Sequence, residues 1–219
     1  EDTEDFIKSI SFGGELYDIL NEKCIFRGLL SHEYDLVPSA LRQENEDYLW
    51  KLSGVKGPKL QLEIAQIDVE QIILYKFYER CDYNCLYIPN SDRIRESQVN
   101  EIYKIQSMNT PEKWIPSDLY EIAALAQHYG LPTRLLDWSR DMFVSLYFAV
   151  NGFINSSLKS DYIVLWALNI DDINFYINDG MPLKLINPPY FANPNLGAQK
   201  GIFTLWEIMK PIKNVSPII

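Results

Sequence analysis

The sequence is poor in the residues that build metal and disulfide sites. Among 219 residues there are three cysteines and two histidines. Cys24, Cys81 and Cys85 are too few for the disulfide framework of a small secreted protein. Cys81 and Cys85 have no second cysteine pair and no nearby histidine, which argues against a zinc site. We therefore expect reduced thiols, no bound metal and a cytoplasmic location.

A long apolar run, a basic surplus and phosphate-binding glycine loops are also missing. No run approaches the roughly 20 apolar residues that span a bilayer, so we expect no membrane partner. The acidic start, residues 1–5, is the opposite of a basic signal peptide. Lys and Arg total 20 against 30 Asp and Glu, and the net charge of −10 opposes a broad nucleic-acid surface. A small basic pocket stays compatible with that charge, because net charge does not describe a single cleft.

What is present indicates an α+β protein. The 47% hydrophobic and 23% charged residues are typical of a globular chain, and we expect a single domain over residues 1–219. Periodicity predicts helices first and strands later, hence a helical N-terminal part and a sheet. The predicted helices are 13–23, 60–83, 94–108 and 117–130, and the predicted strands are 24–26, 133–138, 162–168 and 202–208. Residues 143–150 are apolar nearly all round, which predicts a buried helix or strand.

Two polar segments could provide chemistry: 26–28 and 127–138. Arg27 lies inside an apolar strand, and a guanidinium is rarely buried without an anionic partner. It either forms a structural ion pair, for example with Asp137, or binds a ligand, and both roles are compatible. Strand alternation places Arg134 and Asp137 on opposite faces, so Asp137 is better placed for Arg27 or His128.

The other polar residues of the second segment also allow two interpretations. His128 ends a predicted helix, where capping is as reasonable as catalysis. Thr133 and Arg134 follow a proline turn and either bond the turn and strand edge or face the same cleft as Arg27. Neither a nucleophile–base motif nor a metal-binding cluster is visible, so covalent hydrolase, nuclease and phosphoesterase chemistry lacks support.

The order of these motifs resembles the FRG domain family, named for its Phe-Arg-Gly tripeptide. The tripeptide is residues 26–28, and the most specific block is QHYGLPTRLLDW at 127–138. Further matching blocks are LVPSALR at 36–42, LYFA at 146–149 and AQKGIFT at 198–204. The resemblance covers roughly residues 20–207. It implies a bacterial or phage-related protein acting as a toxin or in defence.

A more distant resemblance is to the ADP-ribosyltransferase fold. That fold has an aromatic residue followed by Arg or His on its first strand, which Phe26-Arg27 resembles. Its middle strand ends in Ser or Thr before a helix, as Asp137-Trp138-Ser139 does before Ser145. Its catalytic glutamate lies near a later strand, where this chain has Gln199. The resemblance implies a split β-sheet and binding of NAD or a related nucleotide.

The chemistry of NAD explains why these residue types are candidates. Arg27 can hold phosphate or ribose oxygens, a hydroxyl can orient the ribose, and a carboxylate stabilises the oxocarbenium formed when nicotinamide leaves. Gln199 offers a hydrogen bond but no charge, so Asp137 or Glu207 would have to supply it. The candidate catalytic residues are Arg27, Gln199 and His128, and the candidate nucleotide-binding residues are Arg27, Thr133, Arg134, Ser139 and Asp137.

The alternative to an ADP-ribosyltransferase or NAD hydrolase is a binding module without catalysis. In that interpretation the motif residues form a nucleotide or partner pocket, or a polar network that serves the fold. Gln199 would then be a strand-end amide that bonds the backbone.

Overall fold

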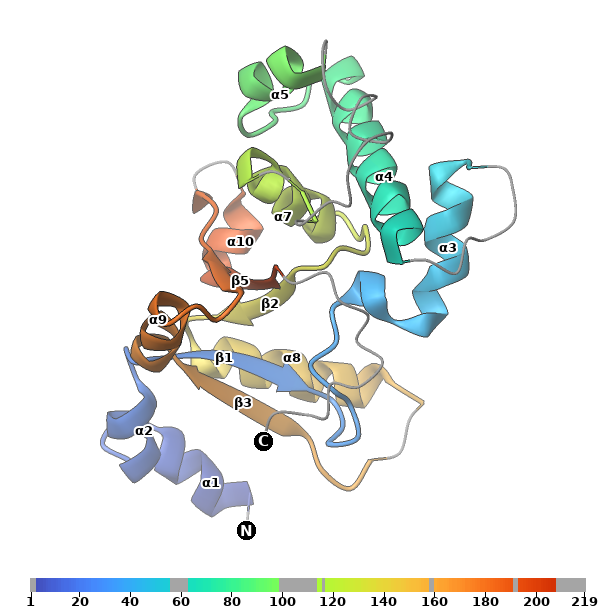
Figure 1. Ribbon diagram of the computed structural model, residues 1–219. Coiled ribbons are helices and arrows are strands. Elements are labelled where there is room, and N and C mark those ends of the chain that lie inside the picture. The colour runs from blue at the N-terminus through green and yellow to red at the C-terminus, as the bar shows by residue number, and fades with distance from the viewer. Residues whose placement is uncertain are drawn as a thin grey trace. The chain divides into compact units, whose positions relative to one another are not determined.

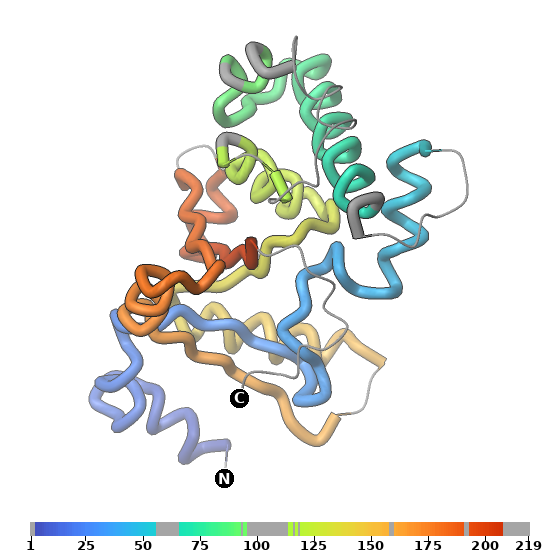
Figure 2. The backbone as a smooth tube through the Cα atoms, viewed as in Figure 1, coloured from blue at the N-terminus to red at the C-terminus, as the bar shows by residue number. Residues whose placement is uncertain are grey.

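The computed structural model describes residues 3–55, 63–98, 114–115, 117–157, 160–190 and 193–207 (Figures 1 and 2). The chain forms two compact units, each assembled from three separate segments. The first unit comprises Glu1–Asp35, Asp137–Leu183 and Asn193–Ile202, and the second comprises Leu36–Leu136, Lys184–Ala192 and Phe203–Ile219. Each is described here by itself, and the expectation of a single domain stays a prediction.

The strands of the described residues form one sheet in the order β3-β1-β2-β5-β4. Their bounds are β1 Cys24–Leu29, β2 Leu136–Ser139, β3 Val164–Asn169, β4 Leu183–Ile186 and β5 Gly201–Trp206. β1 pairs antiparallel with β2 and with β3, and the pairing with β3 runs from Cys24 opposite Asn169 to Leu29 opposite Val164. Because β1 is central to the first unit and apolar, Ile25 and Phe26 are almost completely buried.

The described part of the first unit also holds five helices. They are α1 Thr3–Ile10, α2 Glu15–Leu20, α8 Met142–Asn155, α9 Ile170–Asn178 and α10 Pro194–Ala198. α8 runs alongside β1 (Figure 1), and a hydroxyl–carbonyl hydrogen bond from Ser145 to Phe26 joins them at 2.9 Å. Alternation puts Cys24, Phe26 and Gly28 on the α8 side of the strand and Arg27 on the other.

The described part of the second unit is mainly helical. Its helices are η1 Ser39–Leu41, α3 Gln43–Ser53, α4 Glu63–Tyr83, α5 Ser91–Gln98, η2 Ser117–Leu119 and α7 Tyr120–His128. Two apolar clusters hold them together. Leu49 of α3 packs with Val69 and Ile73 of α4, and Tyr78 of α4 packs with Ile94 and Ile122.

The α+β class is confirmed, with local differences from the sequence-based expectations. β1 continues through Gly28 to Leu29, and β2 begins at Leu136 rather than Thr133. The predicted burial of 143–150 is wrong for one side of the helix, because β1 covers only the other side. Residues 60–62 of one predicted helix and 99–108 of another lie outside the described residues.

Two further findings concern membrane spans and the cysteines. No helix within the described ranges has both the length and the apolar character required to cross a membrane. All three cysteines are free thiols; Cys24 and Cys81 are buried, and burial raises the pKa of both.

Candidate functional site

Arg27 of β1 and Asp137 of β2 form an ion pair within the first unit. Arg27 Nη1 lies 2.8 Å from Asp137 Oδ1 and also donates to the Asp137 backbone carbonyl at 2.6 Å. The Arg27 side chain is only 11% exposed, whereas that of Asp137 is 63% exposed. The expected pairing of Arg27 with Asp137 is thus confirmed, and it fixes a carboxylate at the surface over a buried cation.

The remaining hydrogen-bonding capacity of Arg27 is not fully used. Its Nε is buried and has no hydrogen-bond partner in the part of the chain that the structure describes. A buried donor without an acceptor costs about 1–3 kcal/mol. The guanidinium is therefore only partly satisfied by Asp137, and a further acceptor would stabilise it.

Ser139 and Gln199 are linked through a hydroxyl and a backbone carbonyl. Ser139 Oγ donates to the Gln199 carbonyl oxygen at 2.6 Å and accepts from the Asp141 amide at 3.0 Å. Ser139 is buried, and Gln199 is the C-cap of α10, just before β5. The backbone of Gln199 fixes this end of the strand, because its carbonyl accepts from Ser139 and its amide donates to the Asn195 carbonyl.

Asp141 and Lys200 form a second ion pair beside this link. Lys200 Nζ lies 2.8 Å from Asp141 Oδ2, and Asp141 caps α8 by accepting from the Phe143 and Val144 amides. Burial acts to raise the pKa of Asp141, but the hydrogen bonds from Lys200 and the two amides and the Lys200 charge outweigh it and lower the pKa. Lys200 has a positive φ of 46°, which turns the chain between α10 and β5.

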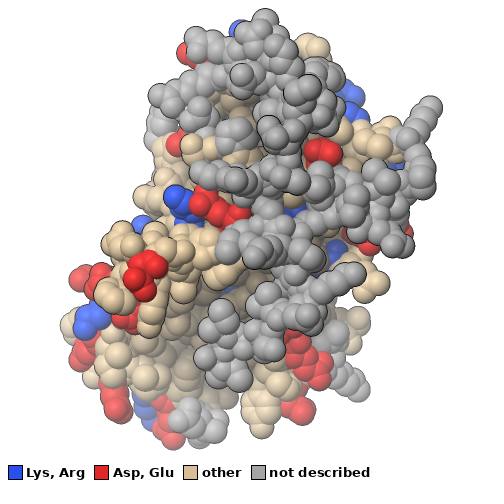
Figure 3. All heavy atoms as spheres, viewed as in Figure 1, with Lys and Arg blue, Asp and Glu red and all other residues tan. Residues whose placement is uncertain are grey.

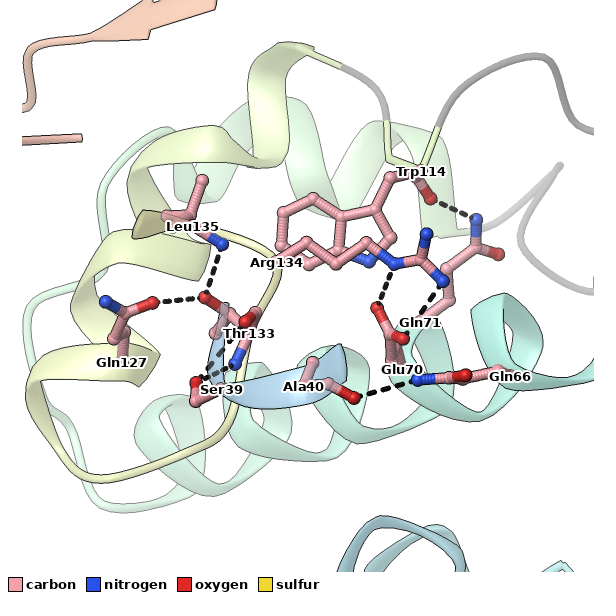
Figure 4. Close-up of polar contacts among 10 residues, drawn as sticks. All are labelled: Ser39, Ala40, Gln66, Glu70, Gln71, Trp114, Gln127, Thr133, Arg134 and Leu135. Atoms are coloured by element: carbon pink, nitrogen blue, oxygen red, sulfur yellow. Dashed lines mark hydrogen bonds and ion pairs between the residues drawn. The ribbon is translucent and has the colours of Figure 1, made fainter. Parts of the chain in front are cut away.

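Thr133 lies in the second unit, where its polar groups all serve the turn that precedes β2 (Figure 4). Its hydroxyl donates to the Gln127 side-chain oxygen and accepts from the Leu135 amide. Its own amide donates to Ser39 Oγ, and its carbonyl accepts from the Ala40 amide. Thr133 is 1% exposed. Its hydroxyl holds the end of α7 against this turn, and its backbone amide and carbonyl hold η1.

Arg134 makes a buried ion pair with Glu70 of α4 (Figure 4). Arg134 Nε and Nη2 donate to the two Glu70 carboxylate oxygens at 2.8 and 3.2 Å. The two side chains are 6% and 2% exposed. Burial raises the pKa of the Glu70 carboxyl, and the charge and hydrogen bonds of Arg134 oppose that shift. The guanidinium thereby attaches this segment to α4.

His128 and Glu207, two further candidates, also belong to the second unit. His128 is the last residue of α7, is partly buried and has its ring edge-on to Tyr129 at 5.5 Å. Glu207 accepts a hydrogen bond from the Tyr120 hydroxyl at 2.8 Å and lies 3.8 Å from Lys184 Nζ. Burial and the Glu207 carboxylate raise the pKa of Tyr120.

The described surface carries no broad basic field on the face drawn in Figure 3, where blue side chains are scattered among red ones. Within the described ranges, no group of three or more His, Cys, Asp or Glu side chains is arranged to hold a metal ion.

Residues 22–157 match the family model of the FRG domain. The match covers more than half of the chain, and the chain belongs to the FRG domain family. No match was found among curated proteins or among solved structures.

The structure assigns partners that the sequence did not reveal. Glu70 was missed although it is an acidic residue within the apolar pattern of a long helix, which is a signal for a buried ion pair. The Asp141–Lys200 pair was missed because its members are 59 residues apart and both lie outside the helices and strands. The ligand-binding roles of Thr133, Arg134 and Ser139 and the catalytic role of His128 stay predictions.

Proposed function

We propose that this FRG domain binds NAD or a related nucleotide in its first unit, at the Arg27–Asp137 pair. The observation that carries the proposal is the pair itself: a mostly buried guanidinium with an unsatisfied Nε beside a 63% exposed carboxylate. Arginine holds phosphate and ribose oxygens through its planar fork, and a fixed carboxylate accepts hydrogen bonds from a ribose diol. Because Nε is covered, Arg27 must shift slightly for a ligand oxygen to reach it.

The strand order supports an ADP-ribosyltransferase-like arrangement. β1 carries Arg27, its neighbour β2 carries Asp137 and Ser139, and β5, which Gln199 precedes, is next to β2. The three motifs therefore follow one another across the sheet. In this arrangement Ser139 is a positioning residue, since its hydroxyl is occupied by Gln199 and Asp141.

The catalytic version of the proposal depends on a negative charge near the scissile bond. Gln199 supplies none, so Asp137 takes that part by stabilising oxocarbenium character as nicotinamide leaves. ADP-ribose then passes to an acceptor or to water. The family resemblance suggests that such an activity serves a bacterial toxin or a defence system.

A second candidate function is nucleotide binding without turnover. Two observations favour it: the amide at position 199, and the internal hydrogen bonds that engage Ser139. The domain would then report or sequester a nucleotide, or present it to a partner.

The test is calorimetric titration with NAD together with measurement of nicotinamide release. We expect the wild-type chain to bind NAD, and Arg27→Ala to weaken binding about tenfold or more, as for a charge-assisted hydrogen bond worth about 1.5–3 kcal/mol. Arg95→Ala is the matched control, because Arg95 is an exposed arginine of another ion pair, with Asp82. That control should bind normally.

Two further variants separate the two functions. If the domain is catalytic, Gln199→Glu should increase nicotinamide release, and Asp137→Asn should abolish it. Binding without release in the wild type and in Gln199→Glu selects the non-catalytic module. A wild-type chain that neither binds NAD nor releases nicotinamide refutes both.

A further inference from the structure

The outward side of α8 is an exposed apolar stripe. Phe143, Tyr147, Val150 and Ile154 are 44%, 62%, 38% and 71% exposed. The opposite side, with Met142, Ser145 and Ala149, is buried and faces β1. A surface helix normally carries charged residues on its outer side, yet Met142–Asn155 contains no Asp, Glu, Lys or Arg.

The spacing of the stripe is the same in both directions along the helix. Its members follow one another at intervals of four, three and four residues, counted along the printed sequence. Intervals of three and four residues place side chains on one seam, as in helix pairs. When two such helices run antiparallel about a twofold axis, Phe143 meets the partner's Ile154 and Tyr147 meets the partner's Val150. A twofold interface requires this self-complementarity.

We propose that the α8 stripe is the interface of a homodimer in which two copies of α8 pack antiparallel. The occupant of the stripe is a second copy of this chain. This inference is independent of the nucleotide proposal, because none of the stripe residues belongs to the Arg27–Asp137 site.

Charge favours a second copy over a lipid surface. The chain carries a net charge of −10, so anionic membranes repel it, and α8 lacks the Lys and Arg that fasten an interfacial helix to headgroups. Two copies of an acidic protein also repel each other unless they meet on a neutral surface. α8 is such a surface, because its 14 residues are uncharged.

The size of the stripe suits a dimer of standard dimensions. The four stripe residues present on the order of 400 Å² of mainly apolar surface, taking about 150–250 Å² for a whole aromatic side chain and somewhat less for Val and Ile. A standard interface buries about 800 Å² per partner, of which roughly 57% is apolar. One stripe therefore provides most of the apolar share of such an interface.

The first experiment measures mass against concentration by sedimentation velocity. We expect the wild-type chain to form dimers that dissociate on dilution, and Tyr147→Glu with Ile154→Glu to be monomeric. The matched control is Phe12→Glu with Ile19→Glu, two apolar residues of the same unit that are 91% and 55% exposed outside the stripe. This control should dimerise like the wild type, and circular dichroism should show both pairs to be folded.

The second experiment tests the antiparallel register by disulfide formation in a Cys85→Ser background, which removes the exposed native thiol. Phe143→Cys and Ile154→Cys are made in separate chains. In the antiparallel dimer, position 143 of one copy lies beside position 154 of the other. Two copies of the same variant therefore place their new thiols about 16 Å apart along the helices, beyond the roughly 7 Å between Cα atoms that a disulfide spans. Only the mixture of the two variants should yield a cross-linked dimer.

Three results would overturn the proposal. One is a wild-type chain that stays monomeric throughout the micromolar range. Another is cross-linking of each variant with itself and none between the two different variants. The third is a monomer that floats with uncharged phosphatidylcholine vesicles through the same stripe, which would make the occupant a lipid surface.

Discussion

At the scale of single residues, the two arginines of the family motifs differ in how their buried guanidinium groups are paired. Arg27 pairs with an exposed carboxylate and keeps one donor unsatisfied, whereas Arg134 is held by both oxygens of the buried Glu70. A buried ion pair contributes little net stability, but removing one member leaves a charge without a partner. Arg134 therefore fixes structure, and Arg27 is the arginine that keeps capacity for a ligand.

Glu70→Gln tests this division. The substitution leaves the Arg134 guanidinium buried with a neutral partner, and the free energy of unfolding should fall by about 3–5 kcal/mol. Urea denaturation measures it. Glu79→Gln, the same change elsewhere on α4, should alter stability by about 0.5 kcal/mol or less. If the free energy of unfolding falls equally little in both variants, the buried Arg134 side chain does not need the Glu70 charge.

Asp141 gives a prediction about acid stability. Its pKa is lowered in the folded chain, so it stabilises the fold above the ordinary value of 3.8, and this contribution disappears as the pH falls through the lowered pKa. Asp141→Asn keeps a capping side chain but loses the charge beside Lys200 and at the N-terminus of α8. It should cost about 0.5–1 kcal/mol at neutral pH.

The pH profile of unfolding by urea checks this. The difference between wild type and Asp141→Asn should be constant near neutral pH and should close below about pH 4, where the carboxyl binds a proton. Asp35→Asn, at an exposed aspartate of the same unit, serves as the control and should show a much smaller difference. A difference that grows towards acid pH would contradict the assignment.

At the scale of elements, the contact of β1 with α8 explains the glycine of the Phe-Arg-Gly tripeptide. A Cβ atom at position 28 would overlap the backbone carbonyl oxygen of Ser145. The overlap is with backbone, so a side-chain rotation cannot relieve it. The glycine is required because the helix lies directly on the strand, and the hydrogen bond from Ser145 to Phe26 fixes that approach.

Gly28→Ala should therefore push α8 away from β1 and destabilise the chain by about 1–3 kcal/mol or more. Gly152→Ala, at a glycine within α8, is the matched control. There a Cβ would meet Leu30 at an ordinary contact distance of 3.4 Å, and alanine is the better helix former by about 1 kcal/mol. In thermal unfolding, the melting temperature of Gly28→Ala should lie well below that of the wild type, and that of Gly152→Ala should equal or exceed it. Equal melting temperatures would show that α8 can move.

The elements that were predicted from sequence are those with a strong local pattern. The periodicity of 60–83 corresponds to α4, and the β-branched and aromatic residues near 24 and 162 correspond to β1 and β3. α3 was missed, because its polar sequence is held by packing of Leu49 against α4 rather than by its own pattern. The exposure of the outer side of α8 could not be predicted, because an apolar helix has the same sequence pattern whether or not a neighbour covers it.

The candidate site was predictable in part for a similar reason. Arg27 stands out locally, as a cation inside an apolar strand, and strand alternation restricted the choice of Asp137. Where the partner depends on the path of the chain, as for Arg134 with Glu70, 64 positions away, local pattern gives no information. Sequence therefore identified the unusual residues better than it identified what each one contacts.

At the scale of the whole molecule, the sequence match and the folded units have different boundaries. The family match ends at residue 157, but β1 pairs along its whole length with β3, which begins at Val164. Ser139 likewise needs the carbonyl of Gln199. The first unit thus cannot be completed by the matched residues, because one edge of β1 and the anchor of β2 come from later in the chain.

We therefore expect the fragment 22–157 not to fold cooperatively, although it contains the most specific family block. Loss of β3 exposes the hydrogen-bonding edge of β1, and an unpaired apolar edge favours aggregation. The second unit is also incomplete in this fragment, since it lacks the strands β4 and β5 and the Tyr120–Glu207 hydrogen bond. Thermal unfolding and amide dispersion in NMR spectra measure the outcome, with residues 1–207 as the control. A sharp transition in 22–157 near that of the control would mean that the β1–β3 pairing is dispensable, and that the matched residues alone determine the fold.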